Sequence, residues 1–247
     1  MKNVYALLQQ QRLSRRKSFA VLVDPDKTEQ LPALLHEAKI HPPDFFFVGG
    51  SLLTNGHLDS CIRLIREHSD VPLVLFPGSA MQVSAAADAL LLLSVISGRN
   101  ADLLIGRHVL AAPAVKQSGL EVIPTGYMLV ESGKATTVSY ITNTQPIPRD
   151  KDNIAAVTAL AGEQLGLKAI YLEAGSGAEM PVPVSMVKYV RAAIDIPLIT
   201  GGGLRRPEDL TERLAAGADL VVVGNILEQR PSLLAEFAGV VRSFTTL

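Results

Sequence analysis

The sequence predicts a parallel α/β barrel of the (β/α)8 type. Its 247 residues suit this fold, because such barrels take about 250 residues in one domain. Short runs rich in Val, Ile, Leu and Phe recur along the chain, bounded by Gly, Pro or Asp, with helical patterns between most of them. Eight such runs over the whole length favour a closed barrel over an open sheet. We therefore expect a single barrel domain over residues 1–247.

The expected strands are buried parallel strands, because each run is apolar almost throughout. In chain order they are Phe19–Val23, Phe45–Val48, Leu73–Phe76, Leu90–Ile96, Glu121–Met128, Ala169–Leu172, Leu198–Thr200 and Leu220–Val223. Only about a dozen residues separate the third strand from the fourth, which is the minimum for a helical crossover. We expect the third helix of the barrel to be short or missing.

Two segments after the fifth strand depart from the regular alternation. The stretch YMLVESGKATTVSYITNT has two β-prone parts around SGK, which predicts a hairpin extension. The segment QPIPRDKDN that follows is typical of a loop, with Asp150 or Asp152 expected to cap the next helix.

Composition and charge exclude several classes of function. Lys and Arg number 23 against 24 Asp and Glu, so no global positive field is present and a nucleic-acid partner is not expected. The single cysteine, Cys61, suits a reducing compartment. No apolar run is long enough to span a membrane, and the N-terminus lacks a signal pattern. We expect a cytoplasmic protein, which would reach a lipid substrate by transient contact with a membrane surface or through a groove.

Polar and glycine-rich residues follow six of the expected strands, in the fragments VDPDK, FVGGS, FPGS, YLEAGSG, ITGGG and VVVGN. In a barrel of this kind, the loops at the carboxyl ends of the strands build the active site. We therefore expect these fragments to meet at one end of the barrel.

The last two strands end in glycines that predict a phosphate site. Gly201, Gly202 and Gly203 precede a helix expected to begin around Pro207, and Gly224 with Asn225 follows the eighth strand. Glycine lets main-chain N–H groups approach an anion closely, and this pair of loops is the usual phosphate site of such barrels. The alternative is that both are only tight strand-to-helix turns.

The sixth strand supplies a candidate general base. Tyr171 and Glu173 share one face of the strand, since alternate residues point the same way. A carboxylate beside a phosphate site is placed to accept a proton from a substrate hydroxyl, so Glu173 is the first catalytic candidate and Tyr171, below it, the second. The alternative is a structural ion pair between Glu173 and a nearby Lys or Arg.

Asp24 and Ser51 are candidate ligands of Mg²⁺. They follow the first and second strands, and a carboxylate and a hydroxyl are hard oxygen ligands that suit magnesium beside a diphosphate. The Asp-Pro-Asp sequence is also a common helix-capping turn, which is the alternative.

These six fragments, in this order and spacing, resemble the geranylgeranylglyceryl phosphate synthase family, which includes bacterial heptaprenylglyceryl phosphate synthases. The resemblance covers nearly the whole chain. It implies a prenyltransferase that joins a polyprenyl diphosphate to the 3-hydroxyl of sn-glycerol 1-phosphate through an ether bond and releases diphosphate. It further implies a groove for the prenyl tail in place of the third helix, and a homo-oligomer, either a dimer or a hexamer.

The resemblance also implies roles for individual residues. It assigns Mg²⁺ to Asp24 and Ser51, and the proton of the glycerol hydroxyl to Glu173. The residues implied to bind glycerol 1-phosphate are Tyr171, Leu172, Glu173, Ala174, Gly175, Ser176, Gly177, Gly202, Gly203, Gly224 and Asn225. Part of the family has a lysine where this chain has Leu22, so the chain resembles the second of the family's two groups. Arg205 is a candidate for the missing positive charge, and a solvated residue at a helix start is its alternative.

Two other functions fit part of the pattern. A sugar-phosphate epimerase or isomerase would share the two glycine loops but would need paired acid and base groups. A non-catalytic protein that binds prenyl phosphates would need the groove but not Glu173. None of the five histidines has a transition-metal spacing, and His57 and His108 lie close enough to strand ends to reach a diphosphate.

Overall fold

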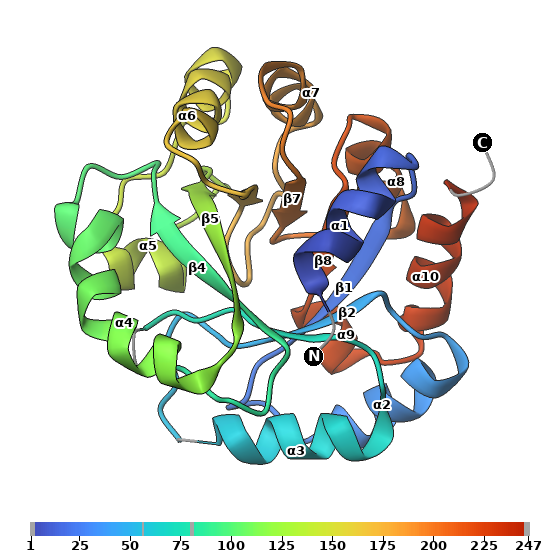
Figure 1. Cartoon of the computed structure of the whole chain (residues 1–247). Coiled ribbons are helices and arrows are strands. Elements are labelled where there is room, and N and C mark those ends of the chain that lie inside the picture. Colours follow the sequence, from blue (N-terminus) through green and yellow to red (C-terminus); the bar gives the residue numbers. More distant parts are fainter. Residues whose placement is uncertain (1–2, 56, 80–81, 245–247) are drawn as a thin grey trace.

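Eight parallel strands close into a barrel in which each strand pairs with its neighbours in sequence and the first pairs with the last (Figure 1). The computed structural model describes residues 3–55, 57–79 and 82–244. The strands are β1 (Ser18–Val23), β2 (Phe45–Val48), β3 (Leu73–Leu75), β4 (Ala89–Val95), β5 (Glu121–Leu129), β6 (Ala169–Glu173), β7 (Leu198–Gly201) and β8 (Leu220–Val223). The predicted (β/α)8 fold is confirmed, and each predicted strand end is within one residue of the observed one.

Helices lie outside the barrel between most of the strands (Figure 1). They are α1 (Val4–Leu13), α2 (Leu31–Ile40), α3 (Leu58–His68), the π-helical turn η1 (Asp102–Gly106), α4 (Arg107–Ser118), α5 (Thr137–Thr142), α6 (Asp152–Gln164), α7 (Val184–Ala193), α8 (Pro207–Ala215), α9 (Asn225–Gln229) and α10 (Leu233–Ser243). The described residues between β3 and β4 contain no helix, as the short crossover predicted.

Alternation along each strand divides the core into an inner and an outer part. In β6, Ala169 and Tyr171 belong to the cluster inside the barrel, whereas Ile170 and Leu172 pack against the helices outside. Because side chains fill the inside, the barrel is a packed core, and ligands can enter only at its ends or between its outer helices.

One end of the barrel is closed by α1. Val4 and Leu8 of this helix pack against the inner cluster, and the carboxylate of Glu121, at the start of β5, accepts hydrogen bonds from the N–H groups of Val4 (2.6 Å) and Tyr5 (3.1 Å). These N–H groups belong to the first turn of α1 and have no acceptor inside the helix. The opposite end, where the strands finish, stays open.

The predicted hairpin after β5 is wrong. Its second part forms the helix α5. The residue before this helix, Thr136, makes a reciprocal capping interaction with Ser139, in which the Thr136 backbone N–H donates to Ser139 Oγ at 3.0 Å. Val138 is buried against the inner cluster. The β-branched residues suggested a strand, but capping and burial outweighed that weak preference.

The predicted cap of α6 is also wrong. The residue before the helix is Lys151, whose side chain makes no capping bond, and Asp150 instead pairs with the Lys151 ammonium at 3.0 Å. Asp152 is the first residue of the helix, where a negative charge is favourable next to the helix N-terminus.

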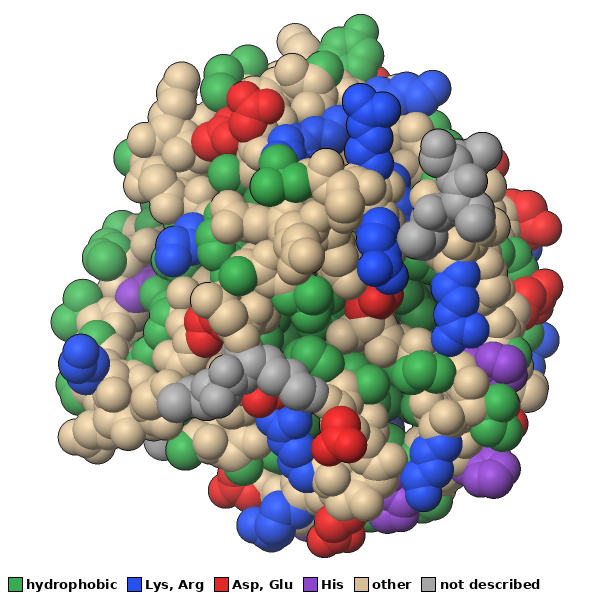
Figure 2. Space-filling model, turned by 45° about the vertical axis from the view of Figure 1, so that its right-hand side comes forward, with side chains coloured by type: hydrophobic (Ala, Val, Ile, Leu, Met, Phe, Trp, Pro, Cys, Tyr) green, Lys and Arg blue, Asp and Glu red, His purple; other side chains and the backbone are tan. Residues whose placement is uncertain are grey.

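On the face shown in Figure 2, basic and acidic side chains are mixed among apolar and neutral surface. Within the described parts of the chain, the helices are all too short or too polar to cross a membrane.

Candidate active site

A polar cavity occupies the open end of the barrel, and we call it the mouth cavity. Its lining comes from the carboxyl ends of β1, β2, β3, β5, β6, β7 and β8, the segments that follow them, and the start of α5. The sequence-predicted residues that line it are Asp24, Ser51, Tyr171, Glu173, Gly175, Ser176, Gly177, Gly202, Gly203, Gly224 and Asn225. Leu172 and Ala174 do not, because the alternation of β6 points both side chains into the outer core. Folding thus brings together residues that are up to about 200 positions apart.

Glu173 is a buried carboxylate at the end of β6 and is only 5% exposed. Its Oε1 accepts a hydrogen bond from the N–H of Gly175 at 2.6 Å. Burial raises the pKa of Glu173 to about 7, although the Gly175 N–H opposes the shift. Among the described residues, no Lys or Arg forms an ion pair with it, so the structural ion pair is not observed. Glu173 can therefore gain and lose a proton near neutral pH.

Tyr171 lies below Glu173 and is fully buried. Its hydroxyl makes no hydrogen bond of ordinary geometry within the described residues, but it lies close enough to the Glu173 carboxylate to lower the pKa of Glu173. Burial and the neighbouring Glu173 carboxylate raise the pKa of Tyr171 well above its usual value, so the phenol stays protonated.

Two glycines of β7 and its loop leave the space that these side chains fill. A Cβ at Gly201 would collide with the Tyr171 hydroxyl, and one at Gly202 would collide with Glu173 Oε1. Gly202 also has a φ of +80°, which other residues rarely adopt. The absence of a side chain is thus required at Gly201 by Tyr171, and at Gly202 by both Glu173 and the turn.

The loops after β6 and β8 are joined across the mouth cavity. The amide of Asn225 donates to Ser176 Oγ at 3.2 Å, and Gly177 lies next to the same amide. In the described parts of the chain, the N–H groups of Gly202 and Gly203 donate to no acceptor. Free N–H groups and polar side chains from three loops therefore surround one space, as an anion such as a phosphate requires.

On the β1 side of the mouth cavity, three charged residues form a compact group. Lys27 Nζ lies 3.1 Å from Asp24 Oδ2 and 3.7 Å from Glu228 Oε2. Glu228 Oε1 accepts a hydrogen bond from the backbone N–H of Asp24 at 3.3 Å. Burial lowers the pKa of Lys27, but the two carboxylates outweigh it and hold this pKa above its usual value. Burial raises the pKa of Glu228, although Lys27 opposes the shift.

Asp24 closes a turn but does not cap a helix. Its Oδ1 accepts a hydrogen bond from the N–H of Asp26 at 3.1 Å, whereas α2 begins only at Leu31. The carboxylate faces the loop after β2, since a Cβ at Gly50 would lie 3.4 Å from Asp24 Oδ1. Asp24 and Ser51 thus lie on adjacent loops of one cavity, and the helix-capping alternative does not hold.

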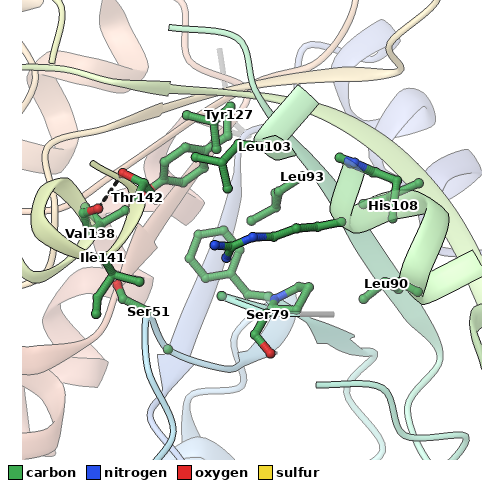
Figure 3. Close-up of a pocket in the computed structure, with 18 of the residues that line it drawn as sticks. Ser51, Ser79, Leu90, Leu93, Leu103, His108, Tyr127, Val138, Ile141 and Thr142 are labelled. Atoms are coloured by element: carbon green, nitrogen blue, oxygen red, sulfur yellow. Dashed lines mark hydrogen bonds between the residues drawn. The ribbon is translucent and has the colours of Figure 1, made fainter. Parts of the chain in front are cut away.

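A second cavity, which we call the side groove, leaves the mouth cavity sideways between β4, α4 and α5. Most of its lining is apolar and includes Leu90, Leu93, Leu103 and Ile141. Figure 3 shows the α5 residues on one side and Leu90 and His108 on the other. Such a groove suits a hydrocarbon chain, and it opens beside the crossover from β3 to β4, whose described residues contain no helix.

The mouth cavity and the side groove meet at five residues that line both. These are Gly50, Ser51, Phe76, Tyr127 and Val138. We call this place the junction. Any ligand with a polar head in the mouth cavity and an apolar tail in the side groove passes the junction.

Sequence reasoning missed Phe76, Tyr127 and Glu228. Tyr127 could have been found from alternation along β5, because it shares a face with Leu129, and Phe76 from its place at the end of β3. Glu228 gave a weaker signal, since it lies one turn into the short helix α9 and approaches Asp24 only in the folded chain.

The remaining candidates lie at the edge of the site. Arg205 lines the mouth cavity, and its guanidinium donates to the carbonyl of Ala178 at 2.7 Å. His108 lines the side groove rather than the mouth, with Nε2 3.3 Å from Ser94 Oγ. His57 precedes α3 and lines neither cavity.

Comparison with known proteins gives a consistent result. Residues 11–241 match the model of the PcrB family. A geranylgeranylglyceryl phosphate synthase of Spirosoma linguale is 55% identical over 96% of this chain and 96% of its own length. One from Thermococcus kodakarensis is 42% identical over 90% of this chain and 89% of its own.

A solved structure has nearly the same fold. It is the (S)-3-O-geranylgeranylglyceryl phosphate synthase of Thermoplasma acidophilum in complex with its substrate sn-glycerol-1-phosphate. The TM-score is 0.91 at 30% sequence identity, and the match covers 98% of this chain and 100% of that one.

Proposed function

Because the chain belongs to the PcrB family, among the geranylgeranylglyceryl phosphate synthases, we propose that it joins a polyprenyl diphosphate to the 3-hydroxyl of sn-glycerol 1-phosphate. The chain is an enzyme of the prenyltransferase class. The observation that carries the proposal is the position of Glu173, a buried carboxylate in a mouth cavity that combines free main-chain N–H groups with an apolar side groove. A sugar-phosphate isomerase would have no use for such a groove.

The acceptor binds at the loops after β6, β7 and β8. Its phosphate lies against the N–H groups of Gly202 and Gly203 and the Ser176–Asn225 pair. The relative from Thermoplasma acidophilum binds sn-glycerol-1-phosphate, which supports this assignment. With the phosphate fixed there, the free primary hydroxyl of the glycerol can reach the Glu173 carboxylate.

The donor binds with its diphosphate on the β1 and β2 side of the mouth cavity and its tail in the side groove. The residues there fit a magnesium ion: Asp24 supplies a carboxylate and Ser51 a hydroxyl, and diphosphate oxygens and water would complete the shell. When bound, the ion would neutralise the charge that develops on the leaving diphosphate. Lys27 is held at the same place by Asp24 and Glu228 and is available as a further cation for the diphosphate.

The reaction exchanges one carbon–oxygen bond for another. The bond between C1 of the allylic donor and its diphosphate oxygen breaks, and its electron pair leaves with diphosphate. The 3-hydroxyl oxygen of the glycerol bonds to C1, and its proton passes to Glu173. Glu173 must be ionised at the start, which its pKa of about 7 allows in neutral solution.

The test is product formation. The purified protein is incubated with radiolabelled sn-glycerol 1-phosphate and a ladder of polyprenyl diphosphates, with magnesium or with EDTA. We expect a lipid-soluble labelled ether that forms only with magnesium. The sn-glycerol 3-phosphate enantiomer should react far more slowly, since its secondary hydroxyl cannot be placed while the phosphate and base are both engaged.

Substitution of Asp24 tests the proposed magnesium site separately. Asp24→Ala should remove most magnesium-dependent turnover without changing thermal unfolding, whereas Asp70→Ala, an exposed residue before β3, should leave turnover unchanged. Full turnover by Asp24→Ala at saturating magnesium would remove Asp24 from the metal site. An absence of ether product with every donor would contradict the proposed function itself.

A further inference from the structure

Two aromatic rings stand at the junction of the mouth cavity and the side groove. Phe76 and Tyr127 are the aromatic residues among the five that line both cavities, and the other three are Gly50, Ser51 and Val138. None of these five carries a charged side chain. Figure 3 shows Tyr127 at the edge of the side groove, across the space from Ser51.

The rings form a close cluster with Tyr171. The ring centroids of Phe76 and Tyr127 are 6.2 Å apart, and each ring stacks on Tyr171, at 5.0 Å and 5.7 Å. Three mutual distances of similar size mean that the rings form a triangle and not a linear stack. Tyr171 is fully buried and belongs to the core, so it holds the other two rings in place.

If the proposed function holds, the reacting carbon of the donor, C1, must lie at this junction. C1 connects the diphosphate, on the Asp24 and Ser51 side, with the tail in the side groove. It must also meet the glycerol hydroxyl beside Glu173. Phe76 and Tyr127 line the one region that both cavities share, and Ser51 faces it from the other side.

We propose that the rings of Phe76 and Tyr127 stabilise the positive charge that develops on the allylic carbon as its bond to diphosphate breaks. The face of an aromatic ring attracts a cation, and the attraction grows where water is excluded. A charged carboxylate at this position would instead capture the allylic cation or bind the magnesium ion. The rings thus lower the barrier to ionisation without taking part in a covalent step.

Simple packing of the core is the competing explanation, and fluorination of Phe76 separates the two. Mono-, di- and trifluorophenylalanine are incorporated at position 76, which weakens the negative face of the ring in steps while keeping nearly the same shape. The single-turnover rate is measured with both substrates saturating, so that product release does not hide the chemical step. The same series at Phe237, a fully buried ring of α10, is the matched control.

We expect the rate to fall stepwise, by about tenfold over the series at Phe76, with the KM of both substrates unchanged. The series at Phe237 should be flat. At position 127, Tyr127→Phe keeps the ring and should retain most of the rate, whereas Tyr127→Leu should lose about tenfold. Thermal unfolding of each variant checks that the fold is intact.

A flat rate series at Phe76, or an equal fall at Phe237, would overturn the proposal. If Tyr127→Phe lost as much of the rate as Tyr127→Leu does, the effect would belong to the Tyr127 hydroxyl. The Tyr127 ring would then have no part in stabilising the cation. If the unsubstituted protein forms no ether product, the proposed function fails and this inference with it. An active protein with flat series means that this inference alone is wrong.

Discussion

At the scale of single residues, the site depends on one carboxylate whose proton affinity is set by burial. Glu173 is the last residue of β6, and the water it would need to stabilise its charge is excluded by the barrel walls. The N–H of Gly175 and the Tyr171 hydroxyl compensate in part. The result is a carboxylate with a pKa of about 7, which suits the proposed role of Glu173 as the general base.

The rate should therefore depend on the ionisation of Glu173. The reaction needs the ionised carboxylate, so kcat should be low below pH 6, rise through about pH 7 and level off above it. Glu173→Gln should lose at least about a hundredfold in kcat and show no such rise, while calorimetry finds glycerol phosphate binding largely kept. The control, Glu236→Gln on the outside of α10, should match the unsubstituted profile. A profile without an inflection near pH 7 would mean that another group takes the proton.

The same burial should cost stability at high pH. The folded state raises the pKa of Glu173 above its usual 4.5, so the folded protein binds the proton more tightly than the unfolded chain does. Stability is then full below about pH 4.5 and is lost as the pH rises towards and beyond 7. Glu173→Gln should thus be more stable than the unsubstituted protein at pH 8, on the order of 2 kcal/mol, and about equal to it at pH 5. Urea unfolding at both pH values measures the difference, and an equal difference at both would refute the linkage.

At the scale of elements, the loops after the strands are shaped by the side chains they face. The loop after β7 passes so close to Glu173 that only hydrogen fits at Gly202. The loop after β6 meets it from the other side, and its Ser176 reaches Asn225 at the start of α9. These contacts fix the distance between the proposed phosphate site and Glu173, which would orient the proposed acceptor for attack.

Gly202→Ala tests this arrangement. The added Cβ would displace the Glu173 carboxylate, so we expect a loss in kcat/KM of about a hundredfold, in both binding and turnover. Gly166→Ala is the matched control, because Gly166 has a similar φ of +89° but open space around it. That control should lose only stability through backbone strain, by about 1 kcal/mol. If both variants lose activity equally, strain and not the collision is the cause.

At the scale of the whole molecule, stability and activity are located at opposite ends of the barrel. The closed end carries α1 and ion pairs such as Arg191 with Asp219 at 2.9 Å, whereas the open end carries every residue of the mouth cavity. Changes at the closed end should therefore alter unfolding without altering turnover.

Glu121→Ala tests whether the closed end affects stability without affecting activity. It removes the acceptor of the Val4 and Tyr5 N–H groups and should lower the free energy of unfolding by about 1 to 2 kcal/mol. Glu121→Gln keeps one acceptor oxygen and should lose less. Both should keep the kcat and KM of the unsubstituted protein at a temperature where each is fully folded. A change in KM with either variant would show that α1 is coupled to the open end.

The barrel and most residues of the mouth cavity could be predicted from the amino-acid sequence. Continuous apolar runs at regular spacing can be buried only as a parallel sheet covered on both faces, and the rule that loops at carboxyl strand ends meet placed Asp24, Ser51, Glu173 and Gly202 together. The short crossover after β3 predicted that no regular helix follows it, and its described residues contain none. These features follow from local periodicity and chain length, both of which can be read from the sequence.

Features that depend on contacts between distant segments became visible in the folded chain and not before. The α5 helix formed where strand-like residues stood, because Val138 is buried against the barrel and Thr136 caps the turn. Glu228 meets Lys27 and Asp24 from about 200 residues away. The triangle of Phe76, Tyr127 and Tyr171 comes from three different strands. Each of these features depends on packing and electrostatic interactions with residues that are distant in the sequence. Local sequence patterns do not identify these neighbours, so the features form only when the barrel closes.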